Sequence, residues 1–110
     1  MFLVVNSKHI AIDNDGYLKD RKQWTPEVAA AIAAQENIQI SDAHWEIIYL
    51  LQDFYREFEI SPAMRALVKY TEKKLGPGKG KSIYLLQLFP PSPAKLASKI
   101  AGLHHPANCL

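Results

Sequence analysis

The sequence contains a single cysteine, Cys109, which is the penultimate residue of the chain. A glycine, two histidines and a proline precede it in the stretch GLHHPANC over residues 102–109. A free cysteine is usually a small buried hydrophobe, but a residue in a proline-containing tail seldom becomes buried. Tails also tolerate incidental residues, so an incidental cysteine is one interpretation. The other is a reactive thiol, because the thiolate is the nucleophilic form of cysteine.

The segment that carries this thiol is predicted to be an arm. Residues 103–110 show no apolar periodicity and contain Pro106, so we expect a mobile C-terminal arm that follows a folded domain over residues 1–102. Seven positions separate Gly102 from Cys109, and a fully extended chain of that length reaches about 23–25 Å. A thiol on such an arm could enter the active site of a partner and withdraw from it.

Several groups near Cys109 in the sequence bear on its ionisation. The terminal carboxylate opposes a thiolate, whereas basic neighbours favour it. The nearest basic candidates are Lys95, Lys99, His104 and His105. The two lysines are four residues apart and share a helix face, so they are candidates for stabilising a persulfide anion. The histidines could tune the thiol or bind a metal with it, although adjacent histidines on a tail more often do neither.

The cysteine count limits the chemistry further. One cysteine permits neither an internal disulfide nor a multi-thiolate zinc site, and it fits a reducing compartment. No general base stands at a motif spacing from Cys109, so a self-contained cysteine hydrolase is not expected. The stretch DNDGYL over residues 13–18 lacks the third acid and the closing glutamate of a calcium loop and is predicted to be a turn. No metal or cofactor is predicted.

Charge is distributed unevenly along the chain. Residues 1–60 hold five basic and ten acidic residues, a net charge of −5, whereas residues 61–110 hold eight basic residues and one acid, a net charge of +7. The basic half is either a solvated surface or a surface for an anionic partner such as RNA, an acidic protein or a persulfide. Arg65 and Lys69 lie four residues apart within it, so they share a helix face.

The elements that would position these residues are predicted from local signals. The pattern FLVVNSKHIAID indicates a β-hairpin with the three-residue loop NSK. Helices are expected to begin near Thr25, Ser41, Ser61 and Ser92, three of them followed directly by proline, and two are expected to end at Gly76 and Gly102. The apolar stretch SIYLLQLF over residues 82–89 is compatible with a helix or a strand.

The sequence therefore predicts a mainly α fold: a compact bundle of about five helices with a small N-terminal β-hairpin and a flexible C-terminal arm. Five apolar residues at helical spacing should form one buried stripe, with Trp45 and Tyr55 widening it: Ile47, Leu50, Leu51, Phe54 and Phe58. No apolar run approaches the roughly 20 residues that span a bilayer, and no signal peptide is evident, so a cytoplasmic protein is expected.

Two stretches resemble a known family: SDAHWEIIYLLQDFYREFEISPAMRALVK over residues 41–69 and YLLQLFPPSPAKLASKIAGLHHPANCL over residues 84–110. They closely resemble the TusE/DsrC family, also called the sulfite reductase gamma-subunit family. The likeness runs essentially end to end, and its most specific part is the last helix followed by the penultimate cysteine. DsrC proteins carry a second cysteine eleven residues before the penultimate one; here that position is Ser98. With one cysteine the chain cannot form an internal disulfide, so it resembles the TusE branch more closely than the DsrC branch.

The resemblance implies a sulfurtransferase that acts as a covalent carrier. In the TusE branch the penultimate cysteine accepts a sulfane sulfur as a persulfide from a TusBCD-like donor complex. It passes the sulfur toward an MnmA-type tRNA thiouridylase, which makes 2-thiouridine at the wobble position. The resemblance also suggests that the helix with Arg65 and Lys69 borders the surface where the arm docks; a solvated helix face is the equal alternative.

Other functions remain open at this stage. A helical domain with a helix–turn–helix segment and a basic half is compatible with a nucleic-acid-binding module. Its expected recognition helix offers Arg65 and Lys69 but no Asn or Gln for base edges. A DsrC-like partner of sulfite reductase and a purely structural adaptor of a sulfur-relay complex are further alternatives. Replacement of Cys109 by serine separates a carrier from a nucleic-acid binder or an adaptor.

Overall fold

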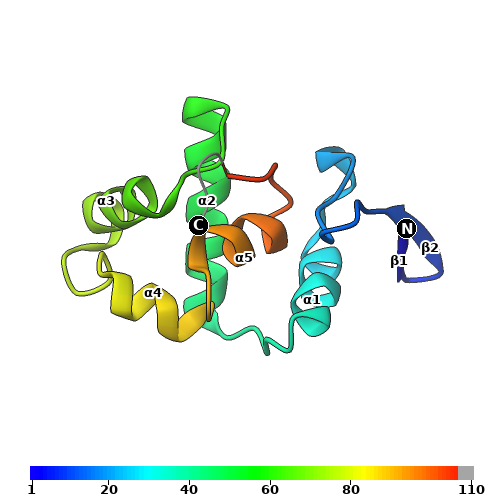
Figure 1. The fold of residues 1–110 in the computed structure, drawn as a ribbon, viewed down its shortest axis with the longest axis horizontal. Helices are drawn as coiled ribbons and strands as arrows, with labels where there is room; N and C mark the ends of the chain where they lie inside the picture. The colour runs from blue at the N-terminus through cyan, green and yellow to red at the C-terminus, as the bar shows by residue number, and fades with distance from the viewer. Residues whose placement is uncertain (107–110) are drawn as a thin grey trace.

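The computed structural model describes residues 1–106 of the chain. Five α-helices follow a two-stranded hairpin and a short 3-10 helix (Figure 1). In chain order the elements are β1 (Phe2–Val5), β2 (Lys8–Ala11), η1 (Arg21–Gln23), α1 (Pro26–Gln35), α2 (Asp42–Phe58), α3 (Met64–Leu75), α4 (Ser82–Leu88) and α5 (Pro93–Ile100). The predicted fold class is confirmed. No helix within the described part is long and apolar enough to cross a membrane.

The hairpin packs on the domain through one face. Leu3 and Ile10 are paired across the two strands and are buried, and β1 contacts α1. The connecting turn has two residues, Asn6 and Ser7, both with positive φ, so the predicted three-residue loop is wrong. Two consecutive residues of positive φ are typical of a type I′ turn, whose twist matches that of the flanking strands. Lys8 therefore belongs to β2 and not to the loop.

Helix α2 is the longest element and runs through the middle of the molecule (Figure 1). Its buried residues confirm four of the five predicted stripe positions and add one: Ile47, Ile48, Leu50, Leu51 and Phe54. Phe58 was predicted to be buried, but it is 48% exposed. It is the last residue of α2, beyond the turns that the other helices cover, and its ring meets those of Phe54 and Tyr70. Trp45 and Tyr55 are half-buried beside the core.

The start of α3 differs from the prediction. The Ser61–Pro62 pair was expected to begin this helix, but α3 begins at Met64 with Ala63 as its N-cap. The Ser61 hydroxyl instead donates a hydrogen bond to the main-chain oxygen of His104, at 2.6 Å. The Ser61 side chain, which could have capped the helix, therefore bonds to an acceptor that is distant in the sequence. The segment over residues 82–89, left open between helix and strand, forms α4.

Helix α5 lies at the centre of the packing, where it contacts the other four α-helices. Most of its residues are buried, and several of them are small, which allows neighbouring helices to approach closely: Pro93, Ala94, Leu96, Ala97, Ser98 and Ile100. Ser98 is fully buried, and its hydroxyl has no hydrogen-bond partner in the described structure. The chain leaves α5 through Gly102 toward the C-terminus.

Candidate functional site

The site is built around the four residues that follow Gly102. Leu103 and Pro106 are buried, whereas His104 and His105 are exposed. We call residues 103–106 the arm root. Cys109, the predicted reactive residue, lies outside the described residues. The domain boundary at residue 102 and the mobility of the arm stay predictions, but the arm root lies against the domain.

The end of α5 fixes the direction in which the chain leaves the helix. Gly102 has φ +78°, and the amide of Leu103 donates to the oxygen of Ser98 at 2.9 Å, closing a Schellman-type turn. The indole Nε1 of Trp24 donates to the oxygen of Ile100 at 2.8 Å. A Cβ at position 102 would lie 2.5 Å from Trp24 Cδ1. Glycine is therefore required here both by the backbone angle and by the indole that covers it.

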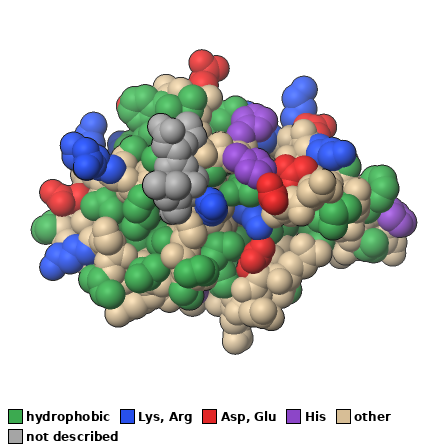
Figure 2. Space-filling model, in the orientation of Figure 1, with side chains coloured by type: hydrophobic (Ala, Val, Ile, Leu, Met, Phe, Trp, Pro, Cys, Tyr) green, Lys and Arg blue, Asp and Glu red, His purple; other side chains and the backbone are tan. Residues whose placement is uncertain are grey.

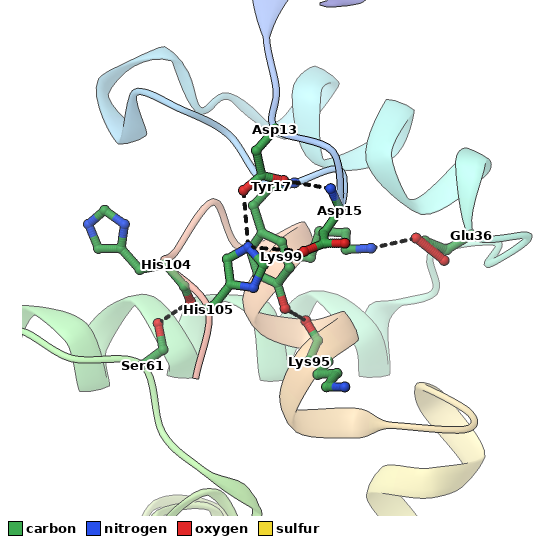
Figure 3. Close-up of polar contacts among 9 residues, drawn as sticks. All are labelled: Asp13, Asp15, Tyr17, Glu36, Ser61, Lys95, Lys99, His104 and His105. Atoms are coloured by element: carbon green, nitrogen blue, oxygen red, sulfur yellow. Dashed lines mark hydrogen bonds and ion pairs between the residues drawn. The ribbon is translucent and has the colours of Figure 1, made fainter. Parts of the chain in front are cut away.

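His105 is held against the N-terminal part of the chain (Figure 3). Its ring stacks on that of Tyr17, with the centroids 3.7 Å apart and the planes 23° from parallel. Its Nε2 lies 3.0 Å from Oδ2 of Asp13 and 3.8 Å from Oδ2 of Asp15. Histidine and acidic side chains accordingly lie side by side on the face shown in Figure 2. One imidazole thus makes a stacking contact and a hydrogen bond.

The turn that receives His105 is itself well supported. Oδ1 of Asp13 accepts hydrogen bonds from the amides of Asp15, at 2.9 Å, and Tyr17, at 3.0 Å. The amide of Asp13 donates to the oxygen of Tyr17 at 2.8 Å. The buried Tyr17 donates its hydroxyl proton to the oxygen of Lys95 in α5, at 3.0 Å. The predicted turn over DNDGYL is therefore confirmed and is attached to the helix that leads into the arm root.

The acidity of Asp13 is shifted by its contacts. Partial burial raises the pKa of its carboxyl, but hydrogen bonds from His105 and from the amides of Tyr17 and Asp15 outweigh that effect. The net pKa lies below the ordinary value of 3.8. Asp13 is therefore ionised near neutral pH and accepts hydrogen bonds with both oxygens.

His104 faces a different neighbour. Its main-chain oxygen accepts the hydrogen bond from Ser61, which lies between α2 and α3 (Figure 3). Its ring centroid lies 5.9 Å from that of Tyr55 in α2. The arm root is thus contacted through His104 by the α2–α3 connection and through His105 by the N-terminal turn.

The predicted basic residues fall in two separate places. Lys95, Lys99 and His105 line one cleft of about 270 Å³, together with Tyr17. Arg65 and Lys69 instead line an open groove of about 610 Å³ between α3 and α4, with Met64, Val68 and Ser82. The two sets are therefore not parts of a single pocket.

The two lysines of the first cleft differ in how their charge is engaged. The Lys99 ammonium pairs with Oε1 of Glu36 at 2.7 Å and lies 5.4 Å from the centre of the Tyr17 ring. The Lys99 side chain is only 12% exposed, so this ion pair ties α5 to the end of α1. Lys95 is exposed. Lys95 is thus the more accessible cation for an anionic group that enters the cleft.

Several residues of the site were not predicted. Asp13, Tyr17 and Ser61 hold the arm root, although the sequence indicated only a turn and a helix cap at these positions. Arg21 and Arg56 line a further cleft of about 280 Å³ beside Gly102. The Asn-Asp-Gly pattern marked the turn, but nothing in the sequence identifies what the turn binds.

Asp13, Asp15 and His105 are also ligand types that metals use, and their ligand atoms lie within 4.8 Å of one another. The histidine nitrogen in this group already has a hydrogen-bond partner in Asp13, and the ring is stacked on Tyr17. His105 is therefore already engaged by Asp13 and Tyr17.

Comparison with protein families gives one match that spans the site. The family model described as "DsrC like protein" matches residues 4–110. A curated protein of Haemophilus influenzae named "Sulfurtransferase TusE homolog" is 52% identical over 98% of this chain and 99% of its own length. "Sulfurtransferase TusE" of Escherichia coli K12 is 48% identical over the same shares of both chains.

Solved structures agree with this similarity. The NMR structure of Allochromatium vinosum DsrC superposes with a TM-score of 0.90 at 44% identity, covering 99% of this chain and 97% of the other. The crystal structure of the oxidised gamma-subunit of dissimilatory sulfite reductase, DsrC, from Archaeoglobus fulgidus superposes with a TM-score of 0.86 at 36% identity, over the whole of both chains. The similarity covers the helices and the hairpin alike.

Proposed function

The chain belongs to the DsrC-like protein family, and from that premise we propose that it is a sulfurtransferase of the TusE type that carries sulfur on Cys109. The family membership confirms the resemblance predicted from the residues. The sulfurtransferase function predicted from it agrees with the names of curated relatives that are about half identical over nearly the whole chain. This full-length similarity is the observation that carries the proposal.

The choice between the two branches of the family rests on the thiol count. The chain has one cysteine, and Ser98 replaces the second cysteine of DsrC proteins. Ser98 is buried in the centre of the helical packing. Because no second thiol is present, the arm cannot alternate between a dithiol and an internal disulfide. A single thiol still supports a persulfide, which is the chemistry of a relay.

The proposed reaction is an exchange of one sulfur atom between two thiols. The Cys109 thiolate attacks the outer sulfur of a donor persulfide, and the bond between the two sulfurs of the donor breaks. A new sulfur–sulfur bond forms on Cys109, and the donor cysteine leaves as a thiolate. No net oxidation occurs, since one persulfide is consumed and one is formed. An acceptor then removes the outer sulfur and restores the Cys109 thiol.

The partners are proposed from the TusE relationship. The donor is a TusBCD-like complex, and the acceptor is an MnmA-type tRNA thiouridylase, with its tRNA, that makes 2-thiouridine at the wobble position. Both transfers would take place in the cytoplasm, where thiols stay reduced. The basic residues supply candidate contacts: Arg65 and Lys69 in the groove between α3 and α4, and Lys95 beside the arm root.

The test is the intact mass of the protein after incubation with a cysteine desulfurase, its relay proteins and cysteine. We expect a gain of one sulfur atom that a reductant reverses and that Cys109→Ser abolishes. In a second assay with an MnmA-type enzyme, radiolabelled sulfur should reach tRNA through the wild-type chain and not through Cys109→Ser. If a competent donor system adds no sulfur to the wild-type chain, the relay function is wrong.

A further inference from the structure

Starting from the proposed carrier function, we propose that Ser61, Asp13 and Tyr17 form a two-sided clamp on the arm root that positions the Cys109 thiol for exchange with its protein partners. These are positioning residues: they act through His104 and His105, and they are not proposed to touch sulfur. The clamp joins the N-terminal turn, the α2–α3 connection and the end of α5 at the point where the arm begins.

The first side of the clamp is Ser61. Ser61 is 6% exposed, and its hydroxyl donates a short, partly buried hydrogen bond to the His104 oxygen, at 2.6 Å. Because the acceptor is a main-chain oxygen, this bond fixes the path of the backbone whatever the side chain at position 104. Ser61 does not cap α3, so its hydroxyl serves this contact in the described structure.

The second side is the surface formed by Asp13 and Tyr17. His105 both stacks on the Tyr17 ring, at 3.7 Å, and bonds to the Asp13 carboxylate, at 3.0 Å. Tyr17 is buried and bonded to the oxygen of Lys95, so the platform is fixed to α5 itself. A ring held both at its face and at its edge loses the freedom to rotate away from the domain.

The clamp matters because it shortens the tether that carries the thiol. Without it the arm would extend over the seven residues from Gly102 to Cys109. With residues 103–106 held, Cys109 lies three positions beyond the buried Pro106, and these three steps span at most about 10–11 Å. Since effective concentration falls with tether length to roughly the −3/2 power, the shorter tether raises the thiol's local concentration about fourfold at a partner site that lies within its reach.

The first test measures the clamp directly and is independent of sulfur transfer. In the wild-type protein, backbone amide relaxation should give His104 and His105 order parameters like those of the helices, about 0.85. In His105→Ala and Ser61→Ala we expect the amides of residues 104 and 105 to fall below about 0.6. The matched control is His9→Ala on the hairpin, which should leave these amides rigid. Unchanged order parameters of residues 104 and 105 in both His105→Ala and Ser61→Ala would overturn the clamp.

The second test connects the clamp to function. Loading of Cys109 from the protein donor should fall about three- to tenfold in kcat/KM in His105→Ala and Ser61→Ala, and not in His9→Ala. The reaction of Cys109 with a small disulfide reagent should stay within about twofold of wild type, since a small reagent needs no positioning. His105→Phe keeps the stacking contact, so its kcat/KM for loading should lie between those of His105→Ala and the wild type.

The outcomes separate the two proposals. If the wild-type chain accepts no sulfur from a competent donor, the carrier function fails, whatever the relaxation data show. If His105→Ala and Ser61→Ala are both loaded with sulfur as fast as the wild type, the carrier function stands and the positioning role is wrong. If His105→Ala slows the small reagent as strongly as the protein donor, His105 tunes the thiol chemically and the clamp proposal is overturned.

Discussion

At the scale of single residues, Gly102 and Asp13 set the geometry from which the arm begins. Gly102 turns the chain out of α5 under the indole of Trp24, and Asp13 holds both its own turn and the ring of His105. Each residue meets two requirements at once, so each tolerates little change. Both lie on the domain side of the arm, where substitutions can be assessed by stability as well as by sulfur transfer.

Gly102→Ala should destabilise the protein by about 2–4 kcal/mol. A non-glycine residue at φ +78° costs about 1–2 kcal/mol, and the new methyl group would lie 2.5 Å from Trp24 Cδ1, so the indole must move. Urea unfolding measures the loss. Gly78→Ala is the matched control, because a Cβ there meets nothing within 4 Å, and it should change the stability by less than about 0.5 kcal/mol. Equal stabilities of the two variants would contradict this account of Gly102.

Asp13→Asn should lower stability in a pH-dependent way. The folded-state pKa of Asp13 lies below its ordinary value of 3.8, so the ionised carboxylate stabilises the fold above that pH. This contribution is lost as the pH falls through the folded-state pKa. Wild type should therefore be more stable than the variant at about pH 5, and the difference should shrink below about pH 4. Urea unfolding over this range measures it; a difference that grows on acidification would contradict the sign.

At the scale of elements, α2 is tied at its start to the end of α4. The side chain of His44 takes part in a capping box with Ser41, and its Nε2 lies 2.7 Å from the oxygen of Leu88. The ring also meets that of Phe89 edge-on, at 5.1 Å. One histidine therefore satisfies a helix N-terminus and joins two helices that are far apart in the sequence, which is a structural role.

His44→Ala should cost about 1–3 kcal/mol in the free energy of unfolding, since it removes a cap and an interhelical hydrogen bond. Because this position lies outside the arm root, kcat/KM for sulfur loading should stay within about twofold of wild type at temperatures where the variant is folded. Thermal unfolding and the intact-mass assay test the two halves of this prediction. A fall in loading without a fall in stability would give His44 a direct role in transfer.

At the scale of the whole molecule, the charge asymmetry suits association with partners. The basic half of the chain includes Arg65 and Lys69, which line an open groove with an apolar part between α3 and α4. Such a combination attracts an anionic partner from a distance and offers apolar contact on arrival. Figure 2 shows hydrophobic side chains alongside Lys and Arg side chains over this part of the molecule.

Arg65→Ala combined with Lys69→Ala should raise KM for a protein partner about three- to tenfold at low ionic strength and leave kcat unchanged, because exposed charges act mainly on association. The effect should shrink as added salt screens the charges. Lys73→Ala is the control: it removes a charge from the same helix outside the groove. Sulfur-loading kinetics at several salt concentrations measure the effect. An equal rise in KM in the control would indicate that the effect comes from the net charge of the protein and not from the groove.

The sequence by itself predicted most of the elements and limited the chemistry open to the thiol. Proline after an N-capping residue marked the starts of α1 and α5 because these signals are local, and they act within one turn of helix. The lone cysteine excludes an internal disulfide, because that conclusion depends on residue identity alone, and the relay role of Cys109 stays a proposal. The family was predicted from the resemblance of residues 41–69 and 84–110, and the family match over residues 4–110 confirms it.

Only the tertiary structure decided what holds the arm root. Ser61 bonds to a residue 43 positions away and His105 to one 92 positions away, and no periodicity or cap signal encodes such pairings. The local pattern was even misleading at Ser61, where the helix cap predicted from Ser-Pro gave way to a hydrogen bond with the main-chain oxygen of His104. The Ser61 side chain is buried and takes the partner that the packed chain brings to it, because a buried hydroxyl left without a hydrogen bond costs about 1–3 kcal/mol.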